Sequence, residues 1–153
     1  MKRWLLYIIV LLLCGVSSNG GTDIGELAPV EVVWLSETAG QIYLETDTGD
    51  MGRGDTIQAA LTDMKAAAPG TIFLETADYL IVEPGSEILL EQLYDILRPS
   101  CKVCAAQSMP DLEEVAPFLN AHEPQVTLRQ YQVETCVLPL LGEQEGRFVW
   151  NAE

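Results

Sequence analysis

Apolar and polar side chains alternate along several short stretches of this chain, the period of two that is expected for strands with one face in a core. The first stretch, residues 30–35, is followed by the turn SETAG and by QIYLETD, residues 41–47, so the two form a predicted hairpin. Alternating or continuous apolar runs predict further strands at residues 71–75, 79–83, 101–106, 126–140 and 147–150. GEQEG makes the predicted turn before the last of these.

A helical period replaces the alternation after residue 55. Asp55, with Gln58 three residues later, is the predicted N-cap, and Pro69-Gly70 ends the helix. The preceding GDMGRGD, residues 49–55, is predicted to be a loop because three glycines interrupt it. The apolar face of the helix comprises Ile57, Ala60, Leu61, Met64 and Ala68.

Two more helices are predicted further along the chain. One follows Pro84-Gly85-Ser86 and ends before Pro99, because proline disfavours helical geometry in the residue that precedes it. The other spans residues 111–121, with Asp111 as its N-cap, and Pro117 should kink it or divide it into two short pieces.

The order of elements is β-β-α-β-β-α-β-α-β-β, in which strands and helices are mixed but do not strictly alternate. We therefore expect an α+β fold: a mixed, mostly antiparallel sheet with about three helices packed on one face. A chain of 153 residues, 48% of them hydrophobic, is long enough for one such domain, which is predicted to cover residues 27–153.

The start of the chain is a basic pair followed by an apolar run. Lys2 and Arg3 precede WLLYIIVLLLC, a run shorter than the roughly 20 residues that a membrane-spanning helix needs. It is typical of a signal peptide, and Val16-Ser17-Ser18 supplies the residues for cleavage after Ser18. Residues 1–18 are thus a predicted signal peptide, and residues 19–26 (NGGTDIGE) a polar linker.

Three forms of this N-terminus stay open: cleavage and secretion, an uncleaved membrane tether, and lipid attachment at Cys14. Lipid-modified cysteines normally follow a small residue, whereas Leu13 precedes Cys14. In each form the domain is extracytoplasmic, either secreted or tethered to the membrane through its N-terminus.

The composition is strongly acidic. Loss of residues 1–18 removes Lys2 and Arg3 from the 8 basic residues and none of the 23 acidic ones, which leaves a formal net charge of −17. Such a charge repels nucleic acid and anionic lipid headgroups, so membrane contact is expected only through a retained N-terminal segment. It favours cationic partners or weakly held divalent cations, and a merely solvated acidic surface explains it as well.

RPSCKVCAA, residues 98–106, is the stretch with the most evident chemistry. A thioredoxin-like pair needs its first cysteine at a helix N-terminus, whereas these cysteines follow the proline that ends a helix. Along a strand, Cys101 and Cys104 point to opposite faces. We therefore expect Cys101 to pack in the core and treat Cys104 as a candidate reactive thiol.

Zinc or a disulfide are the alternatives for these residues. Cys101, Cys104, His122 and Cys136 form C-x2-C-x17-H-x13-C, a tetrahedral zinc set in residue type. A single disulfide would join Cys136 to one of the other two thiols. His122, the one histidine, also fits the negative end of a helix dipole, and that role is favoured. No metal and no cofactor are therefore predicted.

No other stretch carries a catalytic signature. Asp47, Asp50 and Asp55 in ETDTGDMGRGD could gather calcium, but the loop lacks the alternate-position carboxylates and the terminal glutamate of an EF-hand. A turn capped by its aspartates is the favoured interpretation. With no nucleophile elbow, phosphate loop or zinc-protease helix, no catalytic residue is assigned and the chain is predicted not to be an enzyme.

Four short motifs resemble a known family: Glu26-Leu27-Ala28, Gly49-Asp50, Leu80-Ile81-Val82-Glu83 and Leu97-Arg98-Pro99. Together with the order of elements over residues 24–106, they are similar to the N-terminal domain of the Ger(x)C family, the C subunits of spore germinant receptors. Family members are typically longer lipoproteins with a Gly-Cys lipobox, so the resemblance implies a stand-alone relative of the first domain.

The resemblance implies an exported, non-enzymatic binding or assembly module that contacts proteins at a membrane surface, with a link to spore germination or sporulation. Germinant receptor A and B subunits are the partners that it implies. The alternative is a secreted thiol-redox or zinc-binding protein that uses the CKVC cysteines.

Overall fold

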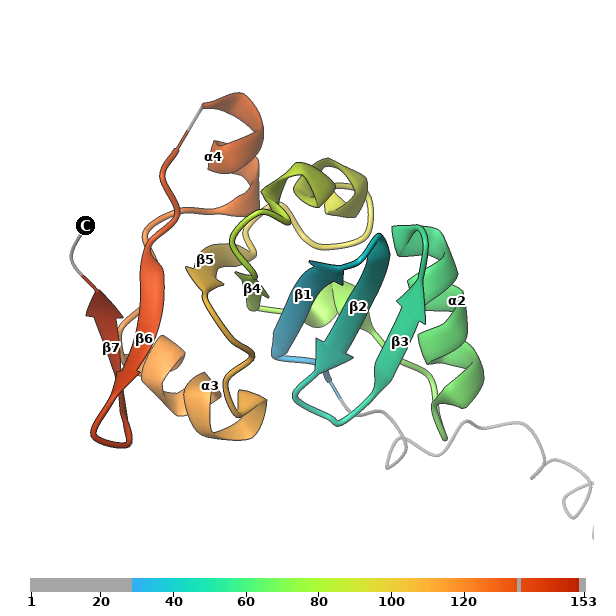
Figure 1. Cartoon of the computed structure of the whole chain (residues 1–153), viewed down its shortest axis with the longest axis horizontal. Coiled ribbons are helices and arrows are strands. Elements are labelled where there is room, and N and C mark those ends of the chain that lie inside the picture. The colour runs from blue at the N-terminus through green and yellow to red at the C-terminus, as the bar shows by residue number, and fades with distance from the viewer. Residues whose placement is uncertain (1–28, 135, 152–153) are drawn as a thin grey trace, which may run out of the picture.

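The computed structural model describes residues 29–134 and 136–151 (Figure 1). The predicted signal peptide 1–18, the linker 19–26 and the candidate lipidation site Cys14 lie outside these residues. Within the described part of the chain, no helix is both long and apolar enough to cross a membrane.

One seven-stranded sheet forms the centre of the fold, in the order β3-β2-β1-β4-β5-β6-β7. Its antiparallel pairs are β1–β2, β2–β3 and β6–β7, and its parallel pairs are β1–β4, β4–β5 and β5–β6. The mixed sheet confirms the predicted α+β class, although parallel pairs are as many as antiparallel ones. The strands are β1 (Val32–Thr38), β2 (Gln41–Thr46), β3 (Met51–Gly54), β4 (Tyr79–Val82), β5 (Lys102–Ala106), β6 (Leu140–Gln144) and β7 (Arg147–Asn151).

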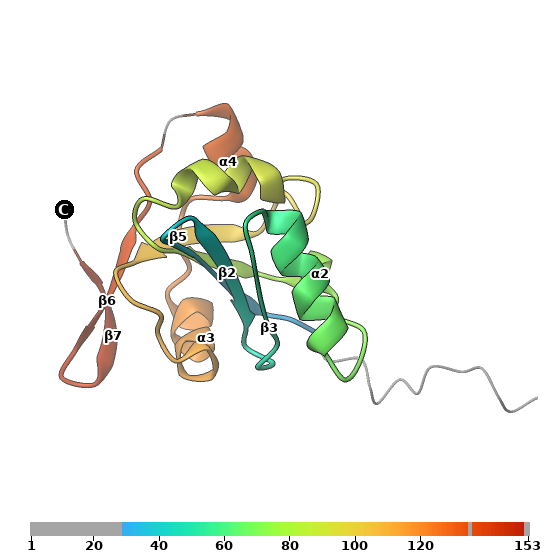
Figure 2. The ribbon, with the colours of Figure 1, turned by 45° about the vertical axis from the view of Figure 1, so that its right-hand side comes forward.

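Helices cover both faces of this sheet. On one face lie α2 (Ile57–Ala67), the 3-10 helix η3 (Glu87–Leu93) and α4 (Leu128–Val133), which share a core cluster with Leu35 and Leu80. On the other face lies α3 (Leu112–Ala121), which packs on Trp34, Ile81 and Cys104. Figure 2 shows α3 below the sheet and the η3 and α4 segments above it.

The expectation of helices on one face was therefore wrong. The central strands β1, β4 and β5 are buried on both faces, as their patterns of consecutive buried residues show. Uninterrupted apolar runs such as YLIV in β4 are typical of strands with a layer on each side, and parallel pairing favours them.

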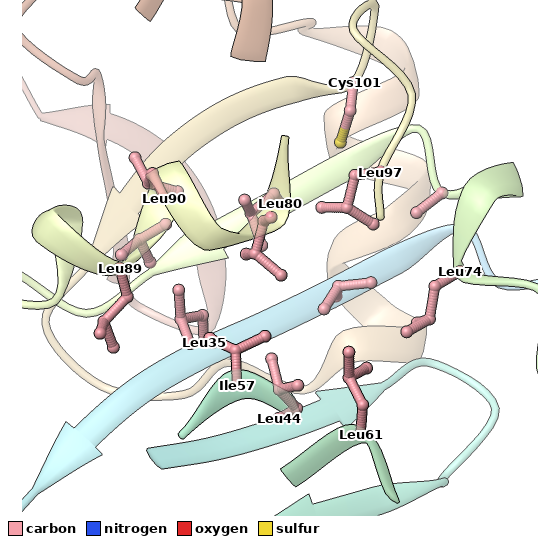
Figure 3. Packing of buried hydrophobic residues seen from close by; sticks show 14 of the residues in the cluster. Leu35, Leu44, Ile57, Leu61, Leu74, Leu80, Leu89, Leu90, Leu97 and Cys101 are labelled. Atoms are coloured by element: carbon pink, nitrogen blue, oxygen red, sulfur yellow. The ribbon is translucent and has the colours of Figure 1, made fainter. Parts of the chain in front are cut away.

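The core cluster that contains Leu35 and Leu80 is seen from close by in Figure 3. Leu44 from β2, Ile57 and Leu61 from α2, and Leu89 and Leu90 from η3 surround them. Burying a side chain of this size contributes about 1.5–3 kcal/mol. Leu97 and Cys101 close the cluster near the start of β5.

The predicted long strand at residues 126–140 was wrong, because residues 128–133 form the helix α4. Thr127 caps it: its Oγ1 accepts from the Gln130 N–H at 3.1 Å, and Gln130 Oε1 accepts from the Thr127 N–H at 2.9 Å. This reciprocal capping box satisfies two backbone donors that a helix start otherwise leaves unpaired. The final strand and its turn are confirmed as the hairpin β6–β7.

Two smaller predictions were also wrong, and a third needs a correction of helix type. Thr56, not Asp55, caps α2, since its Oγ1 accepts from the Ala59 N–H at 3.1 Å. Residues 71–75, predicted as a strand, contribute one isolated bridge at Phe73 and the start of the 3-10 helix η2 (Leu74–Thr76). The second predicted helix is present after Ser86, but as the seven-residue 3-10 helix η3, which ends at Leu93.

The predicted glycine loop is partly the edge strand β3. A Cβ on Gly52 would lie 2.1 Å from the Ala60 carbonyl oxygen of α2, and one on Gly54 would lie 2.6 Å from the Ala59 Cβ. These glycines therefore permit the strand and the helix to approach closely.

The helix at residues 111–121 is confirmed. Asp111 Oδ1 accepts from the N–H groups of Glu113 and Glu114, both at 3.0 Å. The helix α3 runs as one element past Pro117, so the predicted division into two pieces does not occur.

Candidate functional site

The CKVC cysteines lie at the start of β5 with their side chains on opposite faces of the sheet. Cys101 belongs to the cluster with Val103 and Leu97, and Cys104 to the cluster with Trp34 and Ile81. Both side chains are fully buried. The predicted divergence of the two thiols is thus confirmed, and they do not form a bridge.

Burial also makes both thiols poor nucleophiles. Removal from water raises the pKa of Cys101 to about 12, with Arg98 partly opposing the shift. Burial raises the pKa of Cys104 further still, with Cys101 adding to the effect. Because the thiolate is the reactive form and the Cys104 side chain is fully buried, its surroundings do not favour a reactive thiol.

The candidate zinc residues are dispersed. Cys136 is a half-buried free thiol on the connection between α4 and β6, and His122 is the C-cap residue of α3. Nowhere in residues 29–134 and 136–151 do three His, Cys, Asp or Glu side chains gather in a way that could hold a metal ion. Cys101, Cys104, His122 and Cys136 are therefore not brought together in the structure.

His122 takes the predicted place at a helix end, but its ring packs against an aromatic cluster. Its centroid lies 5.0 Å from that of Phe118, which also contacts Phe148 and Trp150. The His122 carbonyl accepts from Trp150 Nε1 at 3.1 Å. These contacts join the end of α3 to the hairpin β6–β7.

The candidate calcium loop is a turn held by its own side chains. Asp47 Oδ1 accepts from the backbone N–H groups of Glu31 at 3.0 Å and Val32 at 3.2 Å. Thr48 Oγ1 donates to Asp50 Oδ2 at 2.8 Å. The carboxylate of Asp47 therefore fixes the start of β1, in agreement with the turn interpretation.

A groove beside α4 is the strongest candidate for a binding site. Its position depends on the start of β5, where the N–H of Leu128 donates to the Cys101 carbonyl at 2.8 Å and the N–H of Arg129 donates to the Pro99 carbonyl at 3.1 Å. Figures 1 and 2 both show α4 beside the yellow-green η3 segment at one end of the molecule.

We define the α4 groove as three adjoining hollows of about 530, 460 and 440 Å³. The first two share Glu87 and Tyr131, and the last two share Val137, Leu138 and Leu140. The lining also includes Ile88, Glu91, Tyr94, Cys136, Glu123 and Trp150.

The α4 groove exposes apolar side chains to solvent. Ile88 is 77% exposed and Val137 is 70% exposed, although both are aliphatic residues that burial would stabilise. Tyr131 lies between them, half-buried, and lines the two hollows that contain them. The surface is therefore suited to contact with another apolar group.

The groove is also acidic. Each charged side chain among the lining residues is a glutamate: Glu87, Glu91 or Glu123. Burial first, then the charge of Glu87 and the neighbouring Cys136, raise the pKa of Tyr131. Burial and Glu91 similarly raise the pKa of Tyr94. Both tyrosines stay neutral and offer hydroxyl groups for hydrogen bonding.

This groove was not predicted from the sequence, because residues 126–140 were placed in one long strand. The Thr127-x-x-Gln130 spacing was the signal for a helix there.

Comparison of the chain with protein-family models, with curated proteins and with solved structures finds no match. The groove residues therefore carry the functional interpretation by themselves.

Proposed function

We propose that this chain is an extracytoplasmic, non-enzymatic binding module that acts in protein assembly at a membrane surface through the α4 groove. The observation that carries the proposal is the exposure of Ile88 and Val137 around half-buried Tyr131. Contiguous apolar surface with a polar border is typical of sites where proteins meet.

The residues of the α4 groove favour a binding role over a catalytic one. Its tyrosines have raised pKa values and are not poised as bases, and its one thiol, Cys136, has no histidine among the residues that line the same hollow. A nucleophile needs a base within hydrogen-bond reach. What the lining does offer is apolar area, tyrosine hydroxyls and negative charge.

The proposed biological setting rests on the resemblance to the Ger(x)C family. Two of the motifs that carry it contribute to the core cluster that η3 and α4 share: Leu80 and Val82 from β4, and Leu97 from the segment before β5. Germination or sporulation, with receptor A and B subunits as partners, is the proposed context.

The germination context can be tested in a spore-forming organism that carries this gene, by replacing the gene with variant copies. The double substitution Ile88→Ser/Val137→Ser should slow nutrient-triggered germination as much as deletion does, because it removes the apolar contacts. Met51→Ser is the matched control, since Met51 is 60% exposed but lies on the edge strand β3. Normal germination in the deletion strain would refute the germination context.

Photo-cross-linking tests the binding role separately. A photoreactive side chain at position 88 or 137 should cross-link the A or B subunit in intact cells, whereas one at position 51 should not. The thiol-redox and zinc alternative gains no support from the geometry, because Cys101 and Cys104 are buried on opposite faces and Cys136 is apart from both.

A further inference from the structure

We infer that the partner segment in the α4 groove is basic and amphipathic, with apolar side chains over the hollows and lysine or arginine side chains against the glutamates. The inference rests on the proposed binding role of the groove and adds the chemistry of its occupant.

The apolar part of the inference follows from the lining. Ile88 lies in the hollow between η3 and α4, and Val137 lines the two hollows on the other side of Tyr131. An occupant that spans them must therefore present apolar side chains at more than one position. The first two hollows are bordered by η3, α4 and the connection before β6 rather than by an open strand edge, so this part of the groove suits a side-chain-mediated contact of the helix-in-groove type.

The charge of the occupant follows from the glutamates of the lining, above all Glu87 and Glu91. Glu87 is shared by two hollows, Glu91 lies in the first, and Glu123 lies in the last, so acidic groups accompany the groove along its whole course. No lysine or arginine is among the residues that line these hollows. Glu123 pairs with Lys102 at 3.7 Å, so Glu87 and Glu91 are the carboxylates left to face an occupant. Opposite charge across such a border accelerates association and selects partners.

The charge of the whole chain acts in the same direction. With a formal net charge of −15, the molecule attracts cationic segments over distances comparable to the Debye length and repels anionic ones. An acidic helix of similar apolar content would meet repulsion both at long range and at the groove. An apolar contact without charge would leave the carboxylates of Glu87 and Glu91 without a cationic partner at its border.

Peptide binding to the full chain, as it is recovered after export, tests the inference. Three fluorescent peptides of equal length serve as probes: leucine and lysine at helical spacing, leucine and glutamate in the same pattern, and the lysine peptide in scrambled order. Fluorescence anisotropy should show the patterned lysine peptide binding roughly tenfold or more tightly than either of the others.

Two pairs of variants locate the binding. Ile88→Ser/Val137→Ser should weaken the lysine peptide roughly tenfold, because the apolar contact is lost, whereas Met51→Ser should not change its affinity. Glu87→Gln/Glu91→Gln should weaken it and flatten its dependence on salt. Glu37→Gln/Glu45→Gln on the hairpin β1–β2 is the matched control. Circular dichroism melting of each variant reports folding separately.

Each contrary outcome has a distinct meaning. Equal binding of the lysine and glutamate peptides, with both lost in Ile88→Ser/Val137→Ser, would overturn the basic partner and leave the binding role intact. Binding that the groove variants do not change would overturn the assignment of the site. No binding of any peptide, with concentration-dependent self-association that Ile88→Ser/Val137→Ser abolishes, would identify a second copy of the chain as the occupant. If no peptide binds and the chain does not self-associate, the inference is also overturned, and cross-linking in cells then decides the binding role.

Discussion

Cys101 and Cys104 are three residues apart in the chain, yet their sulfur atoms lie in separate core clusters on opposite faces of one sheet. The strand β5 separates them, because successive side chains of a strand alternate between its faces. A spacing that suggests a redox pair in sequence thus describes two packed thiols in the fold.

Thiol labelling should distinguish these cysteines. In the variant Cys14→Ser without denaturant, a thiol reagent should modify Cys136 rapidly, because it is the half-buried one, and should reach Cys101 and Cys104 only after unfolding. Further substitution of Cys136→Ser should abolish the rapid phase. Rapid modification of three thiols, or a mass loss of two protons in a Cys101–Cys104 peptide, would contradict this arrangement.

The unfolding free energy should fall as the pH rises above about 9. The ordinary thiol pKa of 9.0 applies to the unfolded chain, whereas burial raises the pKa of Cys101 to about 12 in the folded chain. Between these values the unfolded state binds fewer protons, so alkaline pH favours it by up to about 1.4 kcal/mol per pH unit for each such thiol.

Urea unfolding between pH 8 and 11, under reducing conditions, measures this slope. The variant Cys101→Ala/Cys104→Ala should be less stable overall, because it creates cavities, but should lose less stability with rising pH. Cys136→Ala is the control. An equal slope in the double variant and in the unmodified chain would show that the two thiols do not titrate differently on folding.

Gly52→Ala should destabilise the protein severely. The added Cβ would lie 2.1 Å from the Ala60 carbonyl oxygen, and backbone of α2 and β3 must separate to admit it. We expect a loss of about 3 kcal/mol in the free energy of unfolding, at the upper end of what overpacking costs. Met51→Ala is the control, because the neighbouring Met51 side chain is exposed. It should change the free energy of unfolding by less than about 0.5 kcal/mol.

Thr127→Ala should cost about 1 kcal/mol, because it removes the capping box of α4. Thr127→Ser retains the hydroxyl that accepts from the Gln130 N–H and should restore most of this stability. Chemical denaturation of both variants gives the comparison. Equal stability of the alanine and serine variants would argue against a helix at residues 128–133.

Interactions between residues close in the sequence determine several elements of this fold, and the sequence alone therefore predicted them. The hairpins β1–β2 and β6–β7, the helix α2 and the Asp111 cap of α3 follow from side chains a few residues apart, whose periodicity and hydrogen bonds do not depend on the rest of the molecule. The opposite directions of Cys101 and Cys104 follow from the strand period alone.

The tertiary structure alone decided which faces are covered and where a groove remains. Residues 126–140 satisfy an alternating pattern, but the carbonyls of Pro99 and Cys101 receive the first N–H groups of α4, and its capping box completes the helix. Pairing with β2, together with the close approach to α2 that Gly52 permits, makes the predicted loop the strand β3. Both outcomes depend on contacts outside the segment itself, and so does the α4 groove, whose lining comes from η3, the segment after α3, α4, β6 and β7.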